Sequence, residues 1–199
     1  RGHKVTARGQ EGHAGPTPLP LGRGALLGAA RIVDLVNKVG LGHGPVGCAT
    51  VGMMQVHPNS RNVIPGHVFM TIDFRHPDEE QLLSMDRQMR AGVAEIAERS
   101  RVEADVEEIW HSPPVPFDRS CVESVARATK ELGYTAREMV SGAGHDACYI
   151  SRVAPTSMIF IPCIDGISHN EVEDAKPEWI HAGGNVLLRA MLDKAGRAA

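Results

Sequence analysis

A proline-rich break at residues 111–116 most constrains how this chain folds. The segment reads His111-Ser112-Pro113-Pro114-Val115-Pro116 and separates two stretches whose patterns differ. Proline lacks a backbone N–H and fixes φ, so neither a helix nor a central strand continues through such a run. We therefore predict two domains, one over residues 1–111 and one over residues 112–199.

The first stretch shows a regular succession of strand and helix patterns. Apolar residues alternate, as in half-buried strands, in the segments 4–10, 48–57, 68–74 and 101–110. They recur every three or four residues, as in helices, over 22–39 and 78–99. Gly40 stands where a helix C-terminal glycine belongs, and Asp78 with Gln81 resembles a capping box. The order strand, helix, strand, strand, helix, strand indicates a ferredoxin-like α+β domain.

The second stretch is poorer in strands. Asp118 is expected to cap a helix whose inward side chains are Val122, Val125, Ala126, Thr129 and Leu132. We predict a short strand before Ser141, a strand over Thr156–Ile161 and a final helix from Pro177. About two strands are few for an α/β domain. We therefore expect an incomplete α/β segment whose sheet continues in sequence outside this chain.

Composition narrows the class of partner. The chain is 42% hydrophobic and 23% charged, which suits a packed core, and its net charge is −3. With no basic cluster, nucleic acid and anionic membranes are not expected partners. The four cysteines form no C-x-x-C pair, and three lie in apolar or helical stretches, so we expect buried free thiols and a cytoplasmic protein. Because the chain starts at Arg1 without Met, we expect it to begin partway through a longer protein.

Two histidines lie in glycine-rich turns on either side of the apolar run 158–162. His145 is preceded by Gly144, and His169 follows Gly166-Ile167-Ser168. Such turns at the rim of a sheet are where α/β folds place ligands, and glycine allows the backbone to approach them. The simpler alternative is that each histidine only makes hydrogen bonds in its loop. The matched pair favours a site, and we expect Asp146 to cap the helix that follows rather than to orient His145.

Several motifs together resemble the metal-dependent amidohydrolases of the M20 peptidase clan, in the branch of N-carbamoyl-L-amino-acid hydrolase, β-ureidopropionase and allantoate amidohydrolase. The matching segments, in family order, are Gly12–Pro18, Asn62–Gly66, Asp73–Arg75, Pro114–Asp118, Ser141–Ala147 and Gly166–His169. The resemblance implies that residues 1–111 are a βαββαβ lid or dimerisation domain. Residues 112–199 would then be the C-terminal part of the catalytic domain.

The resemblance also implies two divalent metal ions, Zn, Mn, Co or Ni, in the complete enzyme. A metal-bridging hydroxide would attack the carbonyl of a carbamoyl or ureido group. Most family ligands and the catalytic Glu precede the lid, and here only His169 matches a ligand position, the last one. A stable site needs several converging donors. We therefore expect that this chain alone neither holds two ions nor turns over substrate.

The same resemblance suggests roles for five further residues. His13 would reach across a dimer interface and donate to the developing oxyanion, whereas its simpler role is that of a turn histidine satisfied by the backbone. Arg75 would grip a substrate carboxylate, or else form a surface ion pair with Asp73 or Asp78. Asn62 would hold the same carboxylate, or serve only the turn. The remaining two, Gly144 through its backbone and His145 through its ring, would contact substrate from the catalytic side.

The expected function is therefore part of a homodimeric binuclear-metal amidohydrolase. Its substrate would be a small molecule with a carboxylate and a carbamoyl or ureido group, such as an N-carbamoyl amino acid or allantoate. Two alternatives remain open: an M20 clan peptidase or acyl-amino-acid deacylase, and a non-catalytic dimerisation module. A serine hydrolase is not expected, because Ser141 lies in no G-x-S-x-G motif.

Overall fold

The computed structural model describes residues 1–196 and divides the chain into two compact units. The first unit is Arg1–Pro114 and the second starts at Val115, so the division falls inside the proline-rich break. No helix among the described residues is long and apolar enough to cross a membrane.

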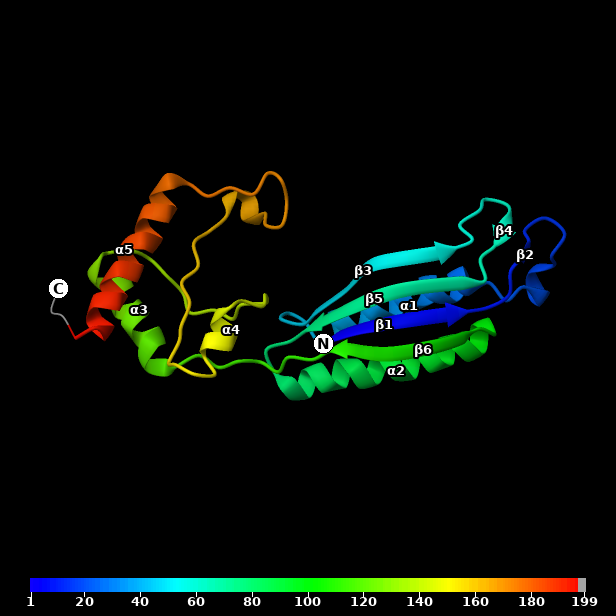
Figure 1. The fold of residues 1–199 in the computed structure, drawn as a ribbon, viewed down its shortest axis with the longest axis horizontal. Helices are drawn as coiled ribbons and strands as arrows, with labels where there is room; N and C mark the ends of the chain where they lie inside the picture. Colours follow the sequence, from blue (N-terminus) through cyan, green and yellow to red (C-terminus); the bar gives the residue numbers. More distant parts are fainter. Residues whose placement is uncertain (197–199) are drawn as a thin grey trace. The chain divides into compact units, whose positions relative to one another are not determined.

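The first unit is a four-stranded sheet with two helices (Figure 1). Its main elements are β1 (Gly2–Arg8), α1 (Ala25–Gly42), β3 (Cys48–His57), β5 (His67–Arg75), α2 (Glu79–Ser100) and β6 (Glu103–Trp110). The sheet order is β3-β5-β1-β6, and every neighbouring pair is antiparallel. The elements thus follow one another in βαββαβ order, with each helix crossing over between two parallel strands.

Alternation along the strands places the core on one face of this sheet. The inward residues are almost fully buried: His3, Val5 and Ala7 on β1, and Val68, Met70, Ile72 and Phe74 on β5. Helices α1 and α2 cover that face with Ile32, Val36, Met85 and Met89. The predicted cap of α2 is confirmed, because the Gln81 backbone N–H donates to Asp78 Oδ1 over 2.9 Å.

Two predictions in this unit are wrong in detail. Helix α1 continues past Gly40 to Gly42, and a Cβ on Gly40 would lie 2.7 Å from the Cβ of Ala49. This glycine therefore allows α1 to approach β3 and does not end the helix. Strand β3 also contains a bulge between Val51 and Met53, so simple alternation fails there.

A two-stranded antiparallel sheet lies beyond the main sheet. It pairs β2 (Gly12–His13) with β4 (Val63–Ile64), and the 3₁₀ turn η1 (Leu19–Leu21) follows β2.

The second unit contains α3 (Arg119–Glu131), α4 (Ala147–Ile150), the 3₁₀ turn η2 (Ile164–Gly166) and α5 (Pro177–Lys194). Helices α3 and α5 pack around the buried side chains Ala128, Val186 and Ala190. The Cys121 N–H donates to Asp118 Oδ1 over 2.9 Å, which confirms the cap of α3.

Other predictions for this unit are wrong. No strand is assigned between residue 115 and residue 196, so the strands expected before Ser141 and over Thr156–Ile161 are not formed. A strand exists only when its backbone groups pair with a neighbour, and these extended segments have no such neighbour among the described residues. The buried residues of α3 are Ser124, Ala128 and Thr129, and Leu132 is exposed.

The cysteines are less buried than expected. Cys48 is exposed, and the other three, Cys121, Cys148 and Cys163, are half-buried free thiols.

Candidate functional site

The two-stranded sheet of β2 and β4 brings two of the predicted site residues together. His13 pairs with Val63 across the ladder, and the Ala14 N–H donates to the carbonyl of Asn62 over 2.9 Å. Both His13 and Asn62 are exposed. These residues are distant in the sequence, yet they lie side by side at one end of the first unit.

The ring of His13 is held by its own turn. The Gly15 backbone N–H donates to Nδ1 of His13 over 3.1 Å. A neutral imidazole has one donor and one acceptor nitrogen, so a ring that accepts at Nδ1 carries its proton on Nε2. His13 therefore presents an N–H donor to solvent.

Asn62 is oriented in a comparable way. The hydroxyl of Ser60 donates to Asn62 Oδ1 over 2.8 Å. With its oxygen engaged, the side-chain amide of Asn62 offers its NH₂ group as a donor. Asn62 and His13 thus both present donors, which suits an anionic or carbonyl oxygen.

Arg75 ends strand β5 and is bound by Asp73. Its Nε donates to Asp73 Oδ1 over 3.0 Å, and its Nη2 donates to Asp73 Oδ2 over 2.7 Å. This hydrogen bonding to Asp73 raises the pKa of the Arg75 guanidinium above its ordinary value, so the group stays cationic. The ion pair with Asp73, which the sequence left open as the alternative role, is formed. It also holds the guanidinium at a half-exposed position at the end of the sheet.

The length of β5 separates Arg75 from the other two predicted site residues of the first unit. Strand β4 of the two-stranded sheet, next to His13 and Asn62, precedes the His67 end of β5, and Arg75 lies at the opposite end. At roughly 3.3 Å per residue, the two ends of β5 are about 26 Å apart. One copy of this unit therefore cannot bring His13 and Arg75 to the same small molecule.

Gly144 and His145 lie in the loop before α4 of the second unit. Gly144 is exposed, and the ring of His145 makes an edge contact with Phe160, with ring centroids 5.5 Å apart. The Nε2 atom of His145 is buried and has no hydrogen-bond partner among the described residues. The expected capping role of Asp146 is wrong, because its side chain makes no capping hydrogen bond to α4.

His169 lies in the loop after η2 and has a left-handed backbone, with φ of 55°. Its backbone N–H donates to Glu173 Oε2 over 2.7 Å, and the residue is exposed. Among residues 1–196, no group of three or more His, Cys, Asp and Glu ligand atoms gathers around it. The donors present in this part of the chain therefore do not fit a binuclear metal centre.

Sequence reasoning missed a charged cluster inside the first unit. His3 is fully buried, and its Nε2 lies 2.7 Å from Asp86 Oδ1 and 3.8 Å from Glu108 Oε2. Asp86 is also held by Arg90 at 3.0 Å, and Glu108 is paired with Arg1. Because each carboxylate already has a guanidinium partner, we interpret the cluster as a buried ion network and not as a metal centre.

Burial lowers the pKa of His3, and Arg90 adds to this effect, while Asp86 and Glu108 act in the opposite direction. The sequence carried a signal for this cluster. His3 is in phase with the inward residues Val5 and Ala7, and Asp86 follows the inward Met85 on α2.

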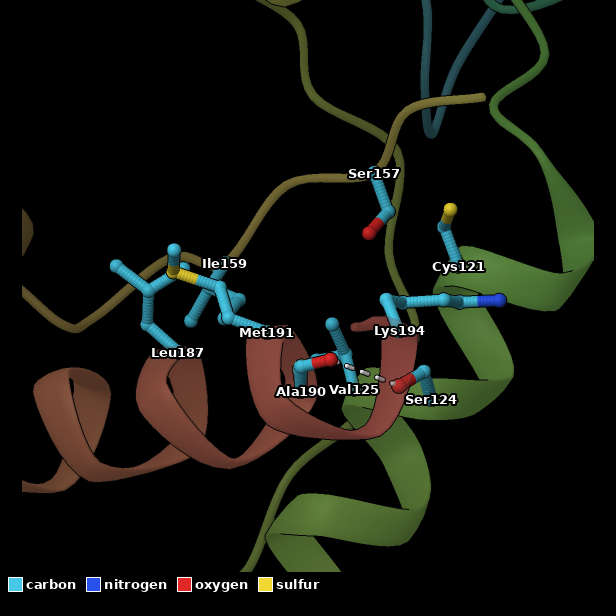
Figure 2. A pocket seen from close by; sticks show the side chains of 9 residues that line it. All are labelled: Cys121, Ser124, Val125, Ser157, Ile159, Leu187, Ala190, Met191 and Lys194. Carbon is cyan, nitrogen blue, oxygen red and sulfur yellow. Dashed lines mark hydrogen bonds between the residues drawn. The ribbon is translucent and has the colours of Figure 1, made fainter. Parts of the chain in front are cut away.

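The second unit contains a cavity of about 290 Å³ between α3, α5 and residues 157–159 (Figure 2). Its lining is mostly apolar, with Lys194 and Cys121 at one side. None of the predicted site residues lines it, so it does not serve the candidate site.

Comparison with known proteins gives consistent matches along the chain. It is 45% identical over 192 residues to an N-carbamoyl-L-amino-acid amidohydrolase of Rhizobium meliloti, covering 96% of this chain and 46% of that protein. It is 34% identical to an allantoate amidohydrolase of Escherichia coli, covering 87% of this chain and 42% of that protein. The crystal structure of a hydantoinase/carbamoylase family amidase from Burkholderia multivorans superposes with a TM-score of 0.93 at 62% identity, covering 100% of this chain and 48% of that one.

The chain thus spans about half the length of the relatives that it matches. The model of the family described as Peptidase family M20/M25/M40 matches residues 8–193, nearly the whole chain, and the chain therefore belongs to this family.

Proposed function

We propose that the whole protein hydrolyses the carbamoyl C–N bond of N-carbamoyl amino acids or of allantoate. Relatives named as N-carbamoyl-L-amino-acid and allantoate amidohydrolases support this choice over a peptidase. The chemistry of the predicted site residues in the first unit supports the same choice. A substrate with a carboxylate at one end and a ureido carbonyl at the other needs a cationic fork and a neutral donor. Arg75, which stays cationic while it is paired with Asp73, supplies the positive charge, and His13 supplies the donor.

The observation that carries the proposal is the hydrogen bond from the Gly15 backbone N–H to Nδ1 of His13, which leaves the proton of a neutral ring on Nε2. Its Nε2–H points away from the Gly15 contact and can donate to the carbonyl oxygen of the ureido group. A donor that is already oriented stabilises the negative charge that develops on that oxygen without reorganising during the reaction. The amide of Asn62, next to His13, offers a second donor at the same end of the unit.

The separation along β5 supports a site shared between two copies of the chain. Strand β3 is an edge of the sheet, and its side chains Met53 and Met54 are exposed. Two β3 strands paired about a two-fold axis perpendicular to them run antiparallel, because rotation about such an axis reverses the strand direction. The His57 end of one copy then lies beside the Cys48 end of the other. That arrangement places His13 and Asn62 of one copy at the end that carries Arg75 of its partner.

In the second unit, His145 and Gly144 would contact the substrate, and His169 would be one metal ligand. The Nε2 of His145 has no partner within residues 1–196, and this supports its role, because a buried imidazole nitrogen without a partner is costly unless a ligand completes it. The other metal ligands would come from sequence outside this chain. The chemistry that we assign to this chain is therefore binding and orientation of the substrate.

The decisive experiment compares Arg75→Met with the unchanged full-length protein on an N-carbamoyl amino acid. We expect kcat/KM to fall by about 30- to 5,000-fold, which corresponds to about 2–5 kcal/mol of transition-state stabilisation, because the substrate carboxylate loses its cationic partner. An N-carbamoyl amine without the carboxylate should show almost no difference between the two proteins. Arg99→Met, at an exposed position in the last turn of α2, is the matched control. Efficient peptide cleavage that is indifferent to Arg75→Met would replace this proposal with a peptidase.

A further inference from the structure

Two arginines join the loop that carries His13 to the end of helix α2. We call residues 10–24 the His13 loop. The guanidinium of Arg101 donates to the carbonyl of Gly22 over 3.0 Å and also to that of Pro20. In return, Nε of Arg23 donates to the carbonyl of Arg101 over 3.1 Å. The contact is reciprocal, with each arginine binding the backbone of the other's segment.

The backbone of Arg101 is in a conformation that favours a different residue. It is the C-cap of α2 and has φ of 54°, in the left-handed region. This position at a helix end is usually glycine, because a Cβ costs free energy there. An arginine in this conformation therefore needs a compensating interaction, and its two hydrogen bonds to the His13 loop supply one.

The rest of the loop links these contacts to His13. At its base, the Gln10 N–H donates to the carbonyl of Arg23 over 2.9 Å. Within it, the Gly22 N–H donates to Pro18 over 3.2 Å, and the Thr17 N–H donates to His13 over 3.3 Å. Three prolines, Pro16, Pro18 and Pro20, further restrict the returning arm. These contacts form a continuous path from Gly22 to the turn that holds the His13 ring.

We propose that Arg23 and Arg101 form a clamp that positions His13 and so keeps its Gly15 contact. Neither arginine contacts the reacting atoms, so both are positioning residues. Their consequence for catalysis rests on the proposed function. Their effect on the position of the His13 ring is independent of the proposed function. The competing role is simple capping of α2, because a cation at a helix C-terminus interacts favourably with the helix dipole.

The variants that separate these roles are Arg101→Gly and Arg23→Gln, alone and together. Glycine suits the left-handed backbone, so Arg101→Gly removes the tether without weakening the end of α2. Arg101→Lys keeps one cationic donor and serves as the conservative variant. Arg99→Ala removes a nearby exposed cation that belongs to no clamp. The first readouts are the ¹⁵N NMR shifts of the His13 ring and the hydrogen exchange of residues 10–24 and 79–100 in this chain.

If the clamp positions His13, the double variant shows a mixture of imidazole tautomers and at least about tenfold faster exchange in the His13 loop, with unchanged protection in α2. Arg101→Lys restores part of the effect, and Arg99→Ala behaves like the unchanged chain. An unaltered His13 tautomer and unaltered loop exchange would overturn the proposal. So would equal loss of protection in α2 and in the loop, which would indicate capping alone.

A second readout uses the full-length protein. The double variant should lower kcat by about 10- to 100-fold, with KM for an N-carbamoyl amino acid changed much less, because Arg75 is intact. Normal kcat in a variant whose His13 ring has become mobile would overturn positioning. If the unchanged protein hydrolyses no carbamoyl substrate, the proposed function fails, and the NMR and exchange results still decide whether the clamp holds His13.

Discussion

The Gly15 backbone N–H donates to Nδ1 of His13 over 3.1 Å, and this contact fixes which ring nitrogen faces solvent. A histidine that must donate to a developing oxyanion works best as the Nε2–H tautomer that is already in place. The turn around His13 therefore does more than give its backbone groups hydrogen-bond partners. It uses one ring nitrogen for the turn and leaves the other for a ligand.

Replacing His13 should affect the rate more than substrate binding. We expect His13→Ala in the full-length protein to lower kcat by about 10²- to 10³-fold, as when one oxyanion donor is removed elsewhere. KM should change much less, because the carboxylate contact at Arg75 is untouched. Steady-state kinetics on an N-carbamoyl amino acid measures both. His13→Gln keeps an N–H donor, so its kcat should lie between that of His13→Ala and that of the unchanged protein. Equal losses of kcat in the two variants would argue against a donor role.

The buried His3 makes the first unit sensitive to acid. Because burial lowers its pKa below the ordinary 6.5, the folded chain binds fewer protons at this site than the unfolded chain. The stability from neutral His3 is therefore complete above pH 6.5 and is lost as the pH falls from there through the folded pKa. Urea unfolding at pH 7.5 and at lower pH should show this loss.

His3→Phe is the informative comparison. Phe places an uncharged ring in the same buried position near Phe74 and cannot titrate. The loss of unfolding free energy on acidification should be smaller in this variant than in the unchanged chain. Asp86 keeps its contact with Arg90, so the variant does not leave that carboxylate without a partner. Parallel pH curves for the two proteins would show that His3 does not contribute.

A close backbone crossing at the base of the His13 loop gives a stability prediction. A Cβ on Gly9 would lie 1.8 Å from the carbonyl oxygen of Arg23, which no side-chain movement can relieve. We expect Gly9→Ala to lower the free energy of unfolding by about 3 kcal/mol or more, at the upper end of overpacking costs. Gly42→Ala is the control, because a Cβ there meets nothing within 4 Å. Because Gly42 is the last residue of α1, that change should alter the free energy of unfolding measured in urea by no more than about 0.5 kcal/mol.

Sequence patterns predicted the first unit well, because its elements are decided by local rules. Alternation identified β5, and Asp78 with Gln81 identified the start of α2. The end of α1 was wrong because Gly40 serves packing against Ala49, which no local rule reveals. In the second unit, Thr156–Ile161 has a strand's composition, but pairing requires neighbours that the described residues do not supply.

The candidate site was predictable only residue by residue. His13, Asn62 and Arg75 were identified through motifs, but neither the strand pairing that joins the first two nor the distance to the third is visible in the sequence. The orienting contacts from Gly15 and Ser60 likewise depend on how each turn folds. His3 and Asp86 shared their phase with apolar residues, and that phase was the available signal for a buried ion network.

The separation along β5 predicts that two inactive full-length variants restore activity when they are combined. If each site takes His13 from one subunit and Arg75 from the other, a heterodimer of His13→Ala and Arg75→Met contains one intact site and one site with both changes. Random reassociation of equal amounts makes about half of the dimers heterodimers, so about a quarter of the full activity should return. The double variant, which carries both changes on one chain, should stay inactive after the same dissociation and reassociation. Mixtures that stay inactive although mass spectrometry detects heterodimers would show that His13 and Arg75 do not act at one shared site, because then no subunit combination could rebuild it.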